Sequence, residues 1–421
     1  MAAGMLSSQI HARGLRVVSC VRVRAGGGTL MSKLNRRTFI GTAIAATGVL
    51  AAVAQTPRAT SRREMLVYVG TYTSGKSEGI YLFRLSLSTG ELKQVGTTRG
   101  VVNPSYLTLD RARRHLYAVN EVEEFAGKKS GAVSAFAVEP TTGALRFLNQ
   151  QPSLGGAPCY VSLDAAEKFL LVANYVGGNV AVLPLRGDAG LDVATDLKQH
   201  QGSGPNRERQ EGPHAHCILP DRTGRHIYSC DLGTDKIMVY RLDAKAGKLI
   251  PNELPWAQVK PGAGPRHLTF HPGGRYAYVT DELDSTITAF AHDPARGTLR
   301  EIQTTPALPA DFKGANTCAD IHLSPDGKFL YCSNRGHDSI AAFRVDSRAG
   351  TLALVSHTPT EGRTPRNFAL DPTGALLLVA NQNSDTIVAF RRDATTGRLT
   401  PAGQVAEVPS PVCLKLIAPF S

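Results

Sequence analysis

A short pattern of residues recurs seven times along this chain and constrains its fold more strongly than any other feature. Each complete copy opens with a proline or alanine, continues into an apolar strand, turns at a sequence such as Asp-Pro-x-Gly, and ends a second strand at Asn or Asp. The copies open at Pro104, Pro158, Pro213, Pro265, Ala319, Pro365 and Pro411. These positions lie 46 to 55 residues apart, a period that is typical of propellers and solenoids and is long enough for four strands.

The seventh copy is incomplete at the C-terminal end, and its missing part lies ahead of the first copy. Residues 411–417 supply one strand, whereas residues 66–70 match a second strand and residues 79–83 a third. We therefore expect a single all-β domain, a seven-bladed β-propeller over residues 65–421, with the last blade closed by N- and C-terminal strands. Closure of this kind protects the strand edges that an open sheet would expose.

The chain before residue 65 has a different composition, which is typical of an export signal. Arg36 and Arg37 precede an apolar run, and Ala52, Val53 and Ala54 form a small-x-small cleavage site. This order of features predicts a twin-arginine signal. We expect cleavage near Ala54 and a periplasmic or secreted protein.

This N-terminal region divides into three predicted parts. Residues 31–54 form the signal, residues 1–30 an extension before it, and residues 55–64 a linker to the propeller. A membrane anchor is the alternative, but roughly 16 apolar residues rich in Ala, Gly and Thr are few for a membrane span, which takes about 20. We therefore expect no stable membrane insertion once the signal is removed.

The signal region also holds much of the positive charge. The chain has 47 Lys and Arg against 35 Asp and Glu, and seven of the basic residues but no acidic residue fall within residues 1–54. The mature chain therefore keeps 40 basic and 35 acidic residues, a net charge near +5 rather than +12. A surplus of this size excludes the basic surface of a nucleic-acid-binding domain.

Six cysteines follow the signal, and we expect them to be mostly free and buried. They are Cys159, Cys217, Cys230, Cys318, Cys332 and Cys413. Five of them lie in or beside predicted strands of different blades, and a domain with a large core does not need disulfides. Cys217 and Cys230 are the pair to check. No CxxC or HxxxH spacing indicates a zinc site, and we expect neither a metal nor another cofactor.

Comparing the copies with one another separates the scaffold from the candidate site. The opening proline, the turn, and the Asn or Asp that ends the second strand recur, as a structural role requires. Two columns of residues vary instead. The first column follows the opening proline and contains Ser105 or Tyr106, Tyr160, His214, Arg266, Asp320 with nearby Asn316, Arg366 and Val412. The second column follows the Asn or Asp and contains Thr71 and Tyr72 of the N-terminal blade, Glu121, Tyr175, Leu232, Glu282, Arg335 and Gln382.

Both columns are expected at one mouth of the central channel, because consecutive strands of a blade are antiparallel. Arginine binds carboxylate or phosphate through two parallel hydrogen bonds, while histidine and glutamate transfer protons. The expected catalytic residues are His214, Arg266, Glu282 and Arg335. The expected substrate-binding residues are His216, Tyr160, Tyr175 and Arg366. The alternative for each is structural, since lone histidines are more often strand or turn residues, and Arg335 with Glu282 also fits an ion pair between neighbouring blades.

Several motifs resemble those of the seven-bladed lactonase family. They are Gly-Pro-His-x-His at 212–216, Gly-Pro-Arg-His at 264–267, Asp-Glu-Leu-x-Ser at 281–285, and Ala-Asp-Ile-His at 319–322 followed by Ser-Asn-Arg at 333–335. That family contains the propeller-type 6-phosphogluconolactonases and the fungal 3-carboxy-cis,cis-muconate lactonising enzyme. The resemblance covers residues 66–421 with all seven units in register.

The resemblance implies a catalytic set and a function. In the muconate enzyme a His, two Arg and a Glu are the proposed catalytic set, and they match His214, Arg266, Arg335 and Glu282, with His216 as the less favoured histidine. We therefore expect a lactonase-type hydrolase, 6-phosphogluconolactonase-like, that opens the ring ester of an anionic sugar or carboxy lactone without metal. His214 or Glu282 would be the general base, while the two arginines would hold the substrate anion and the developing oxyanion.

Two other functions fit the same residues. A muconate-type cycloisomerase would use the same four residues to close a lactone, and a non-catalytic exported propeller would bind a partner, since a fold does not fix a function. WD-repeat scaffolding is disfavoured, because the only tryptophan, Trp256, is expected in a loop between blades. The predicted partner is a small-molecule anionic lactone, and the oligomeric state is left open.

Overall fold

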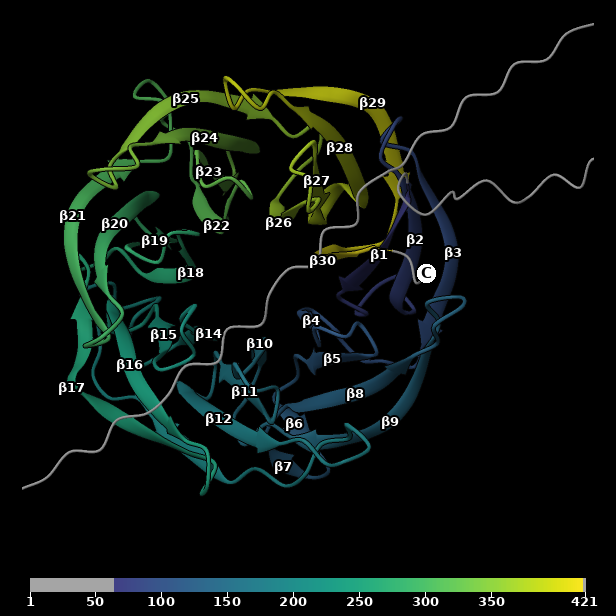
Figure 1. Ribbon diagram of the computed structural model, residues 1–421, viewed down its shortest axis with the longest axis vertical. Helices are drawn as coiled ribbons and strands as arrows, with labels where there is room; N and C mark the ends of the chain where they lie inside the picture. The colour runs from purple at the N-terminus through teal and green to yellow at the C-terminus, as the bar shows by residue number, and fades with distance from the viewer. Residues whose placement is uncertain (1–63, 419–421) are drawn as a thin grey trace, which may run out of the picture. The chain divides into compact units, whose positions relative to one another are not determined.

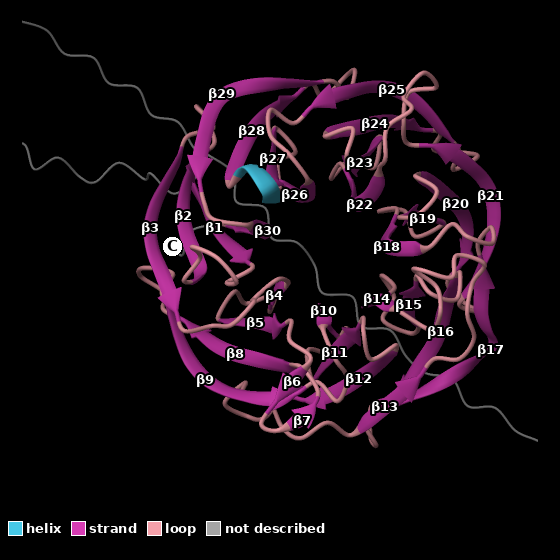
Figure 2. Cartoon of the chain, turned by 180° about the vertical axis from the view of Figure 1, so that it is seen from behind, coloured by secondary structure: helices cyan, strands magenta, loops and turns pink. Residues whose placement is uncertain are grey.

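The computed structural model describes residues 64–418, which form strands joined by turns. The predicted extension (1–30), signal (31–54) and linker (55–64) lie outside the described residues, except that Glu64 is the first residue of a strand. Within residues 64–418 the helical structure amounts to one 3-10 turn, η1 (Gln382–Ser384), drawn in cyan in Figure 2. This part of the chain contains no helix that is long and apolar enough to cross a membrane.

Seven four-stranded antiparallel sheets form the blades, and Figure 1 shows them arranged in a ring around a central axis. Blade 1 contains β4 (Leu107–Leu109), β5 (His115–Asn120), β8 (Ala132–Val138) and β9 (Leu145–Pro152), with a hairpin of β6 (Glu124–Phe125) and β7 (Lys128–Lys129) inserted. Blade 2 contains β10 (Pro158–Leu163), β11 (Phe169–Asn174), β12 (Asn179–Pro184) and β13 (Asp196–Gln199). Blade 3 contains β14 (Ala215–Pro220), β15 (Ile227–Asp231), β16 (Lys236–Asp243) and β17 (Lys248–Gln258).

The remaining blades repeat the same order of strands from the channel outward. Blade 4 contains β18 (Pro265–Phe270), β19 (Tyr276–Asp281), β20 (Thr286–Asp293) and β21 (Thr298–Pro306). Blade 5 contains β22 (Thr317–Leu323), β23 (Phe329–Arg335), β24 (Ser339–Val345) and β25 (Leu352–Pro359). Blade 6 contains β26 (Pro365–Leu370), β27 (Leu376–Asn381), β28 (Thr386–Arg392) and β29 (Leu399–Glu407).

Blade 7 joins the two ends of the described chain, as the repeat predicts. Its strands are β30 (Pro411–Ile417), β1 (Glu64–Thr71), β2 (Gly79–Ser86) and β3 (Leu92–Arg99), with the C-terminal strand innermost. β30 and β1 pair antiparallel in register from Leu66 with Ile417 to Gly70 with Cys413. The predicted all-β propeller of seven blades is therefore confirmed, including its mode of closure.

The core lies between the blades, where the middle strands of adjacent sheets pack together. A tyrosine of the second strand is fully buried in most blades, and its hydroxyl needs a partner there. It donates to a backbone carbonyl in the outer turn of the next blade: Tyr68 to Gly143 (2.7 Å), Tyr278 to Gly350 (3.0 Å) and Tyr331 to Gly397 (2.9 Å). These bonds join blade 7 to blade 1, blade 4 to blade 5, and blade 5 to blade 6.

The prediction for the cysteines is confirmed, whereas the prediction for Trp256 is not. All six cysteines of the propeller are free and buried, including Cys217 and Cys230, which lie directly opposite each other on β14 and β15. The placement of Trp256 in a loop was wrong. It lies in the outermost strand β17, paired with Met238, and its half-exposed ring packs under the ammonium of Lys236 at 4.7 Å.

Candidate active site

A β-bulge at the start of the innermost strand selects which side chain enters the channel. In blade 4, Pro265 lies opposite Asp281, but His267 lies opposite Thr280, so Arg266 is the extra residue between them. The same shift makes His216 the extra residue in blade 3. A bulge of this kind turns one side chain away from its ordinary alternation, and bulges are common beside active sites.

Three other blades carry the same bulge, with different residues in it. The extra residue is Cys159 in blade 2, Arg366 in blade 6 and Val412 in blade 7. The variable first column of the sequence is therefore this bulged position. The proline or alanine before the bulged position pairs with the Asn or Asp that ends the second strand.

The bulge register corrects two of the site residues expected from the sequence. In blade 3 the residue equivalent to Pro265 is Ala215, not Pro213, because Ala215 lies opposite Asp231 as Pro265 lies opposite Asp281. The histidine of the bulge is therefore His216. A slip of register changes the face on which a side chain lies, and aligning the copies by their prolines misplaced the third copy by two residues.

His214 and Tyr160 accordingly lie away from the cavity wall. The His214 ring stacks on Tyr175 with centroids 4.5 Å apart, and its Nε2 lies 3.1 Å from Glu211 Oε1. Tyr160 is one residue past the bulge of blade 2 and stacks on Tyr106 with centroids 4.1 Å apart. We therefore correct both: His216 replaces His214, and Cys159 replaces Tyr160, among the side chains that face the ligand space.

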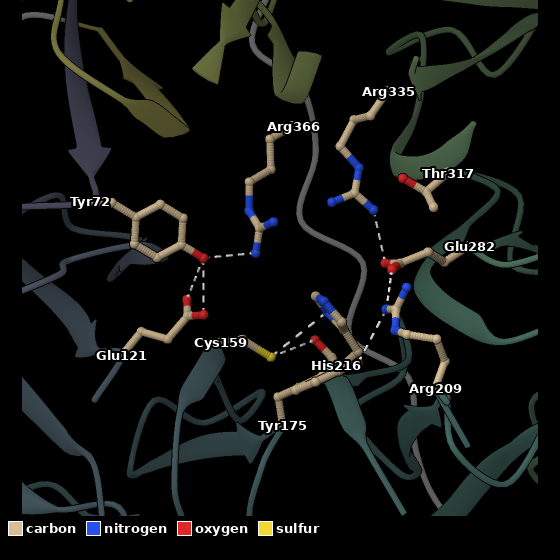
Figure 3. Close-up of a pocket in the computed structure, with 10 residues that line it drawn as sticks. All are labelled: Tyr72, Glu121, Cys159, Tyr175, Arg209, His216, Glu282, Thr317, Arg335 and Arg366. Atoms are coloured by element: carbon tan, nitrogen blue, oxygen red, sulfur yellow. Dashed lines mark hydrogen bonds and ion pairs between the residues drawn. The ribbon is translucent and has the colours of Figure 1, made fainter. Parts of the chain in front are cut away.

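The two columns meet in a cavity of about 370 Å³ at one mouth of the channel (Figure 3). It is lined by Tyr72, Glu121, Cys159, Tyr175, Arg209, His216, Glu282, Thr317, Arg335 and Arg366. Of the eight residues expected from the sequence, five lie on this wall. Arg266 lines a narrower space that shares Glu121, Cys159 and Arg366 with the cavity.

Sequence reasoning missed five residues of the wall. Tyr72 and Glu121 stand in the second column and could have been chosen from it, and Cys159 was hidden by the bulge. Thr317 opens β22, whose bulge is longer by one residue. Arg209 gives no signal in the repeat, because it lies in the connection between blades 2 and 3.

Glu282 is held by three guanidinium groups. Its Oε2 accepts from Arg266 Nε at 2.8 Å and from Arg335 Nη2 at 2.9 Å, and its Oε1 accepts from Arg209 Nη2 at 2.7 Å. Burial alone would raise the pKa of this carboxyl, but Arg335, Arg266 and Arg209 outweigh burial and lower the pKa to about 2. Glu282 therefore remains a carboxylate at neutral pH and accepts protons poorly, which suits an anchor for arginines better than a general base.

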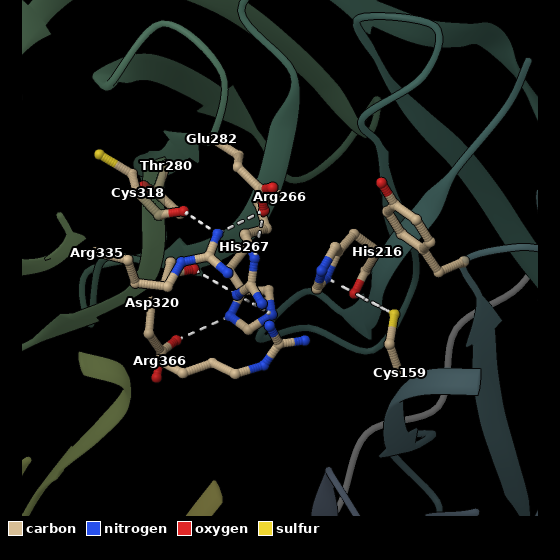
Figure 4. Close-up of polar contacts among 12 residues, drawn as sticks. Cys159, His216, Arg266, His267, Thr280, Glu282, Cys318, Asp320, Arg335 and Arg366 are labelled. Carbon is tan, nitrogen blue, oxygen red and sulfur yellow. Dashed lines mark hydrogen bonds and ion pairs between the residues drawn. The ribbon is translucent and has the colours of Figure 1, made fainter. Parts of the chain in front are cut away.

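A buried chain of contacts supports Arg266 from the side away from the cavity (Figure 4). Arg266 Nη1 donates to the backbone oxygen of Ala319 at 2.6 Å and lies 3.1 Å from His267 Nε2, and His267 Nδ1 lies 2.8 Å from Asp320 Oδ1. Burial and the charge of Arg266 lower the pKa of His267 to about 4 against the opposing effect of Asp320. The neutral ring therefore donates from Nδ1 to Asp320 and accepts at Nε2 from Arg266.

The opposite wall carries an arginine without a counter-ion. Arg366 Nη2 donates to the Tyr72 hydroxyl at 2.8 Å, and its guanidinium lies 5.3 Å from the centre of the Tyr72 ring. The Tyr72 hydroxyl donates in turn to Glu121 at 2.9 Å, and the Ser105 hydroxyl also donates to Glu121. Within residues 64–418, Arg366 forms no ion pair, so most of its donors remain available to a ligand.

His216 lies between the two walls as a neutral side chain. Burial lowers the pKa of its imidazole well below 6.5, and the charges of Arg266 and Arg366 act in the same direction. Its Nδ1 lies 3.7 Å from Cys159 Sγ, while Nε2 forms no hydrogen bond with the described residues. Burial raises the pKa of the Cys159 thiol, which therefore stays protonated. His216 is the one group of the wall that is both neutral and able to accept a proton.

The cavity as a whole favours an anion. Four arginines and two glutamates line it and the space beneath it, and His216 adds no charge, so two positive charges remain in excess. Guanidinium groups bind carboxylate and phosphate through parallel hydrogen bonds. Within the described chain no group of three or more His, Cys, Asp or Glu side chains is placed to hold a metal ion.

A seven-bladed ring with an arginine-rich cavity, one neutral histidine and an anchored glutamate defines a propeller whose cavity suits an anionic small molecule. The chain belongs to the seven-bladed β-propeller lactonase family, whose model matches residues 66–416. It is an enzyme of the lactonase class, a hydrolase that resembles the 6-phosphogluconolactonases.

Named relatives agree with this assignment. The 6-phosphogluconolactonase of Bacillus subtilis is 40% identical over 350 residues, which cover 83% of this chain and 97% of the relative. The 6-phosphogluconolactonase of Formosa agariphila is 35% identical over 308 residues, covering 72% and 86%. Among solved structures, the periplasmic gluconolactonase of Pseudomonas aeruginosa superposes with a TM-score of 0.80 at 37% identity, covering 85% of this chain and 99% of that one.

Proposed function

We propose that this chain hydrolyses the ring ester of an anionic sugar lactone, without a metal ion, as a periplasmic or secreted step of carbohydrate metabolism. The observation that carries the proposal is Arg366, which faces the cavity with a single hydrogen bond and no counter-ion. Arg335 adds to it, because it lines the same cavity and its contacts with Glu282 and with the backbone oxygen of Cys318 both use Nη2, which leaves Nη1 without a partner among the described residues. Donors held ready in this way stabilise an oxyanion that forms during ester hydrolysis.

In the proposed reaction His216 is the general base. Its neutral Nε2 takes a proton from water as the water oxygen attacks the ester carbonyl, and the resulting tetrahedral oxyanion accepts hydrogen bonds from Arg366 and Arg335. The bond from the carbonyl carbon to the ring oxygen then breaks. The imidazolium returns its proton to the departing oxygen, so the products are a hydroxyl group and a carboxylate with its released proton.

The other buried groups have positioning roles in this proposal. Glu282 holds Arg335 at the cavity wall, and Tyr72 with Glu121 holds Arg366. Because removing one partner of a buried ion pair leaves the other charge uncompensated, we expect the pair of Glu282 and Arg335 to be needed for folding as well as for turnover.

The test is hydrolysis of 6-phosphogluconolactone and of gluconolactone by the purified mature chain in the presence of a chelator, with the uncatalysed rate subtracted. Arg366→Gln should lower kcat/KM by about 10²–10³-fold, the effect of losing one oxyanion donor. Arg363→Gln is the matched control, since Arg363 is an exposed arginine three residues before Arg366, in the connection that leads into β26, and its side chain bonds only the backbone of Asn383. Equal activity of both variants and the parent on every lactone would overturn the proposal.

Export is the part of the proposal that rests on the N-terminal sequence. The twin arginines and the apolar run that follows support it, as does the periplasmic gluconolactonase among the similar structures. Fractionation of cells that express the full chain should find the enzyme outside the cytoplasm. Replacing Arg36 and Arg37 by lysine should retain it inside.

A further inference from the structure

Arg209 differs from the other three arginines of the cavity in where it comes from. Arg266, Arg335 and Arg366 lie on strands of the blades, whereas Arg209 belongs to residues 200–214, the longest connection between blades in the described chain. Gln210 beside it is fully buried and donates to Leu232 O and Asp235 Oδ1, both at 2.8 Å. The connection is therefore anchored next to Arg209, which reaches the cavity from a fixed point.

Arg209 is also the arginine that Glu282 needs least, because two other arginines pair with this carboxylate. Glu282 already receives Arg266 and Arg335 on Oε2, and Arg209 alone bonds Oε1. Moving Arg209 away would leave Glu282 paired with two guanidinium groups. The side chain of Arg209 is 38% exposed, against 3% for Arg266 and 13% for Arg335, so Arg209 lies at the rim of the cavity.

The bonding of Arg209 leaves room for a ligand. Only Nη2 is used, toward Glu282 and toward the Tyr175 hydroxyl at 3.2 Å, while Nε and Nη1 form no hydrogen bond with the described residues. Guanidinium N–H groups donate to the oxygens of carboxylates and phosphates, and Nε and Nη1 are free to do so here. His216 is 5% exposed, and Arg366 also lines the narrower space next to Arg266, so both lie deeper than Arg209. An anion at Arg209 would therefore belong to a part of the substrate remote from the ring ester.

We propose that Arg209 is the specificity-determining residue of this enzyme, which holds an anionic group remote from the ring ester and so favours phosphorylated or carboxylated lactones over neutral ones. This inference rests on the proposed lactonase function. Under this inference Arg209 determines which lactones are preferred, whereas Arg366 and His216 act in the hydrolysis of every lactone.

The experiment compares three lactones in the parent and in Arg209→Gln: 6-phosphogluconolactone, glucarolactone, which carries a carboxylate, and uncharged gluconolactone. The variant should lose about 10- to 100-fold in kcat/KM, mainly through KM, on the anionic lactone that the site accepts, and stay within about threefold on gluconolactone. Arg209→Lys should fall between, because it keeps the charge but loses the fixed, planar set of N–H donors. A loss on the phosphate alone or on the carboxylate alone identifies the anion.

The matched control is Arg207→Gln. Arg207 lies two residues away on the same connection, is exposed, and lines a separate surface cavity with Ser203 and Gln210. This substitution removes the same charge from the same connection, and it should leave the preference for anionic lactones unchanged. Melting temperatures of all variants should match the parent.

A binding measurement tests the inference without depending on turnover. Calorimetry with 6-phosphogluconate should show weaker binding by Arg209→Gln and unchanged binding by Arg207→Gln. Unchanged binding and an unchanged ratio of kcat/KM values in Arg209→Gln would overturn the inference, as would an equal loss on all three lactones. Absence of turnover on every lactone with Arg209-dependent binding intact would count against the lactonase function but support the anion site.

Discussion

At the scale of single residues, the proposed chemistry depends on how neighbouring charges shift the pKa values of a glutamate and a histidine. Glu282 has the position expected of a base, yet three guanidinium groups lower its pKa to about 2. His216 has the environment expected of a base, because burial and the charges of Arg266 and Arg366 lower the pKa of its imidazole and keep it neutral. The arginines therefore prevent the carboxylate from taking a proton and prepare the imidazole to take one.

The first prediction concerns His216. His216→Asn should lower kcat by about 100-fold or more, the usual contribution of a positioned general base, while His214→Asn should change kcat by less than about threefold. Because the pKa of His216 lies well below 6.5, the parent rate should already be at its plateau at pH 6.5, with the rising limb at more acidic pH. The measurement is a profile of kcat/KM against pH with spontaneous hydrolysis subtracted. A limb centred near 6.5 or above would exclude His216 as the base.

At the scale of the elements, the residue that ends the second strand joins neighbouring blades. Asn120, Asn174, Asn334 and Asn381 each donate from Nδ2 to a backbone carbonyl of the connection before their blade. Asp231 replaces the amide in blade 3 and accepts from His200 at 2.6 Å instead. Asp281 in blade 4 has no such compensation, since its Oδ1 is buried without a partner.

Asp281→Asn should therefore stabilise the protein. Burial raises the pKa of Asp281 to about 8, so the folded state holds a proton that the unfolded state releases. The stability that the protonated carboxyl contributes is complete below about pH 4 and is lost as the pH rises through 8. The variant should raise the melting temperature by roughly 2–4 °C near pH 8 and by less near pH 5.

Asn334→Asp in the next blade is the reciprocal control. It removes an amide that donates to Ala307 O at 2.9 Å, so it should lower the melting temperature. Differential scanning calorimetry at pH 5 and pH 8 measures both. A lower stability of Asp281→Asn at both pH 5 and pH 8 would show that the Asn found here in other blades is not the more stable residue in blade 4.

At the scale of the whole molecule, stability depends on closing the ring. β30 contributes Cys413 and Leu414 to the cores on its two sides and pairs with β1 along its length. Without it, β1 would present an unpaired edge to the channel. The seventh blade therefore couples the two ends of the propeller.

Truncation before Pro411 should abolish cooperative folding. The residues removed include the whole of β30, and the buried side chains of β1 lose the strand that covers them. Far-UV circular dichroism and thermal melting of the truncated chain should show no sharp transition, whereas removal of residues 419–421 alone should leave the melt intact. A truncation before Pro411 that melts cooperatively would contradict this account of closure.

The sequence by itself determined the number of blades, the position of their strands and the closure between the termini. Those features follow from local information repeated seven times: alternating apolar residues, a turn, and an Asn or Asp at a constant offset. Both columns of variable residues were visible for the same reason, and Arg266, Glu282, Arg335 and Arg366 could be chosen from them. All four lie at the ligand space.

Only the tertiary structure decided the rest. A bulge is a property of two paired strands, so the choice of His216 over His214 and of Cys159 over Tyr160 depended on the partner residues across the ladder. The pKa of Glu282 depended on charges from three separate segments, the nearest of which is sixteen residues away. Arg209 has no equivalent in the other copies, so a comparison of the repeats could not identify it.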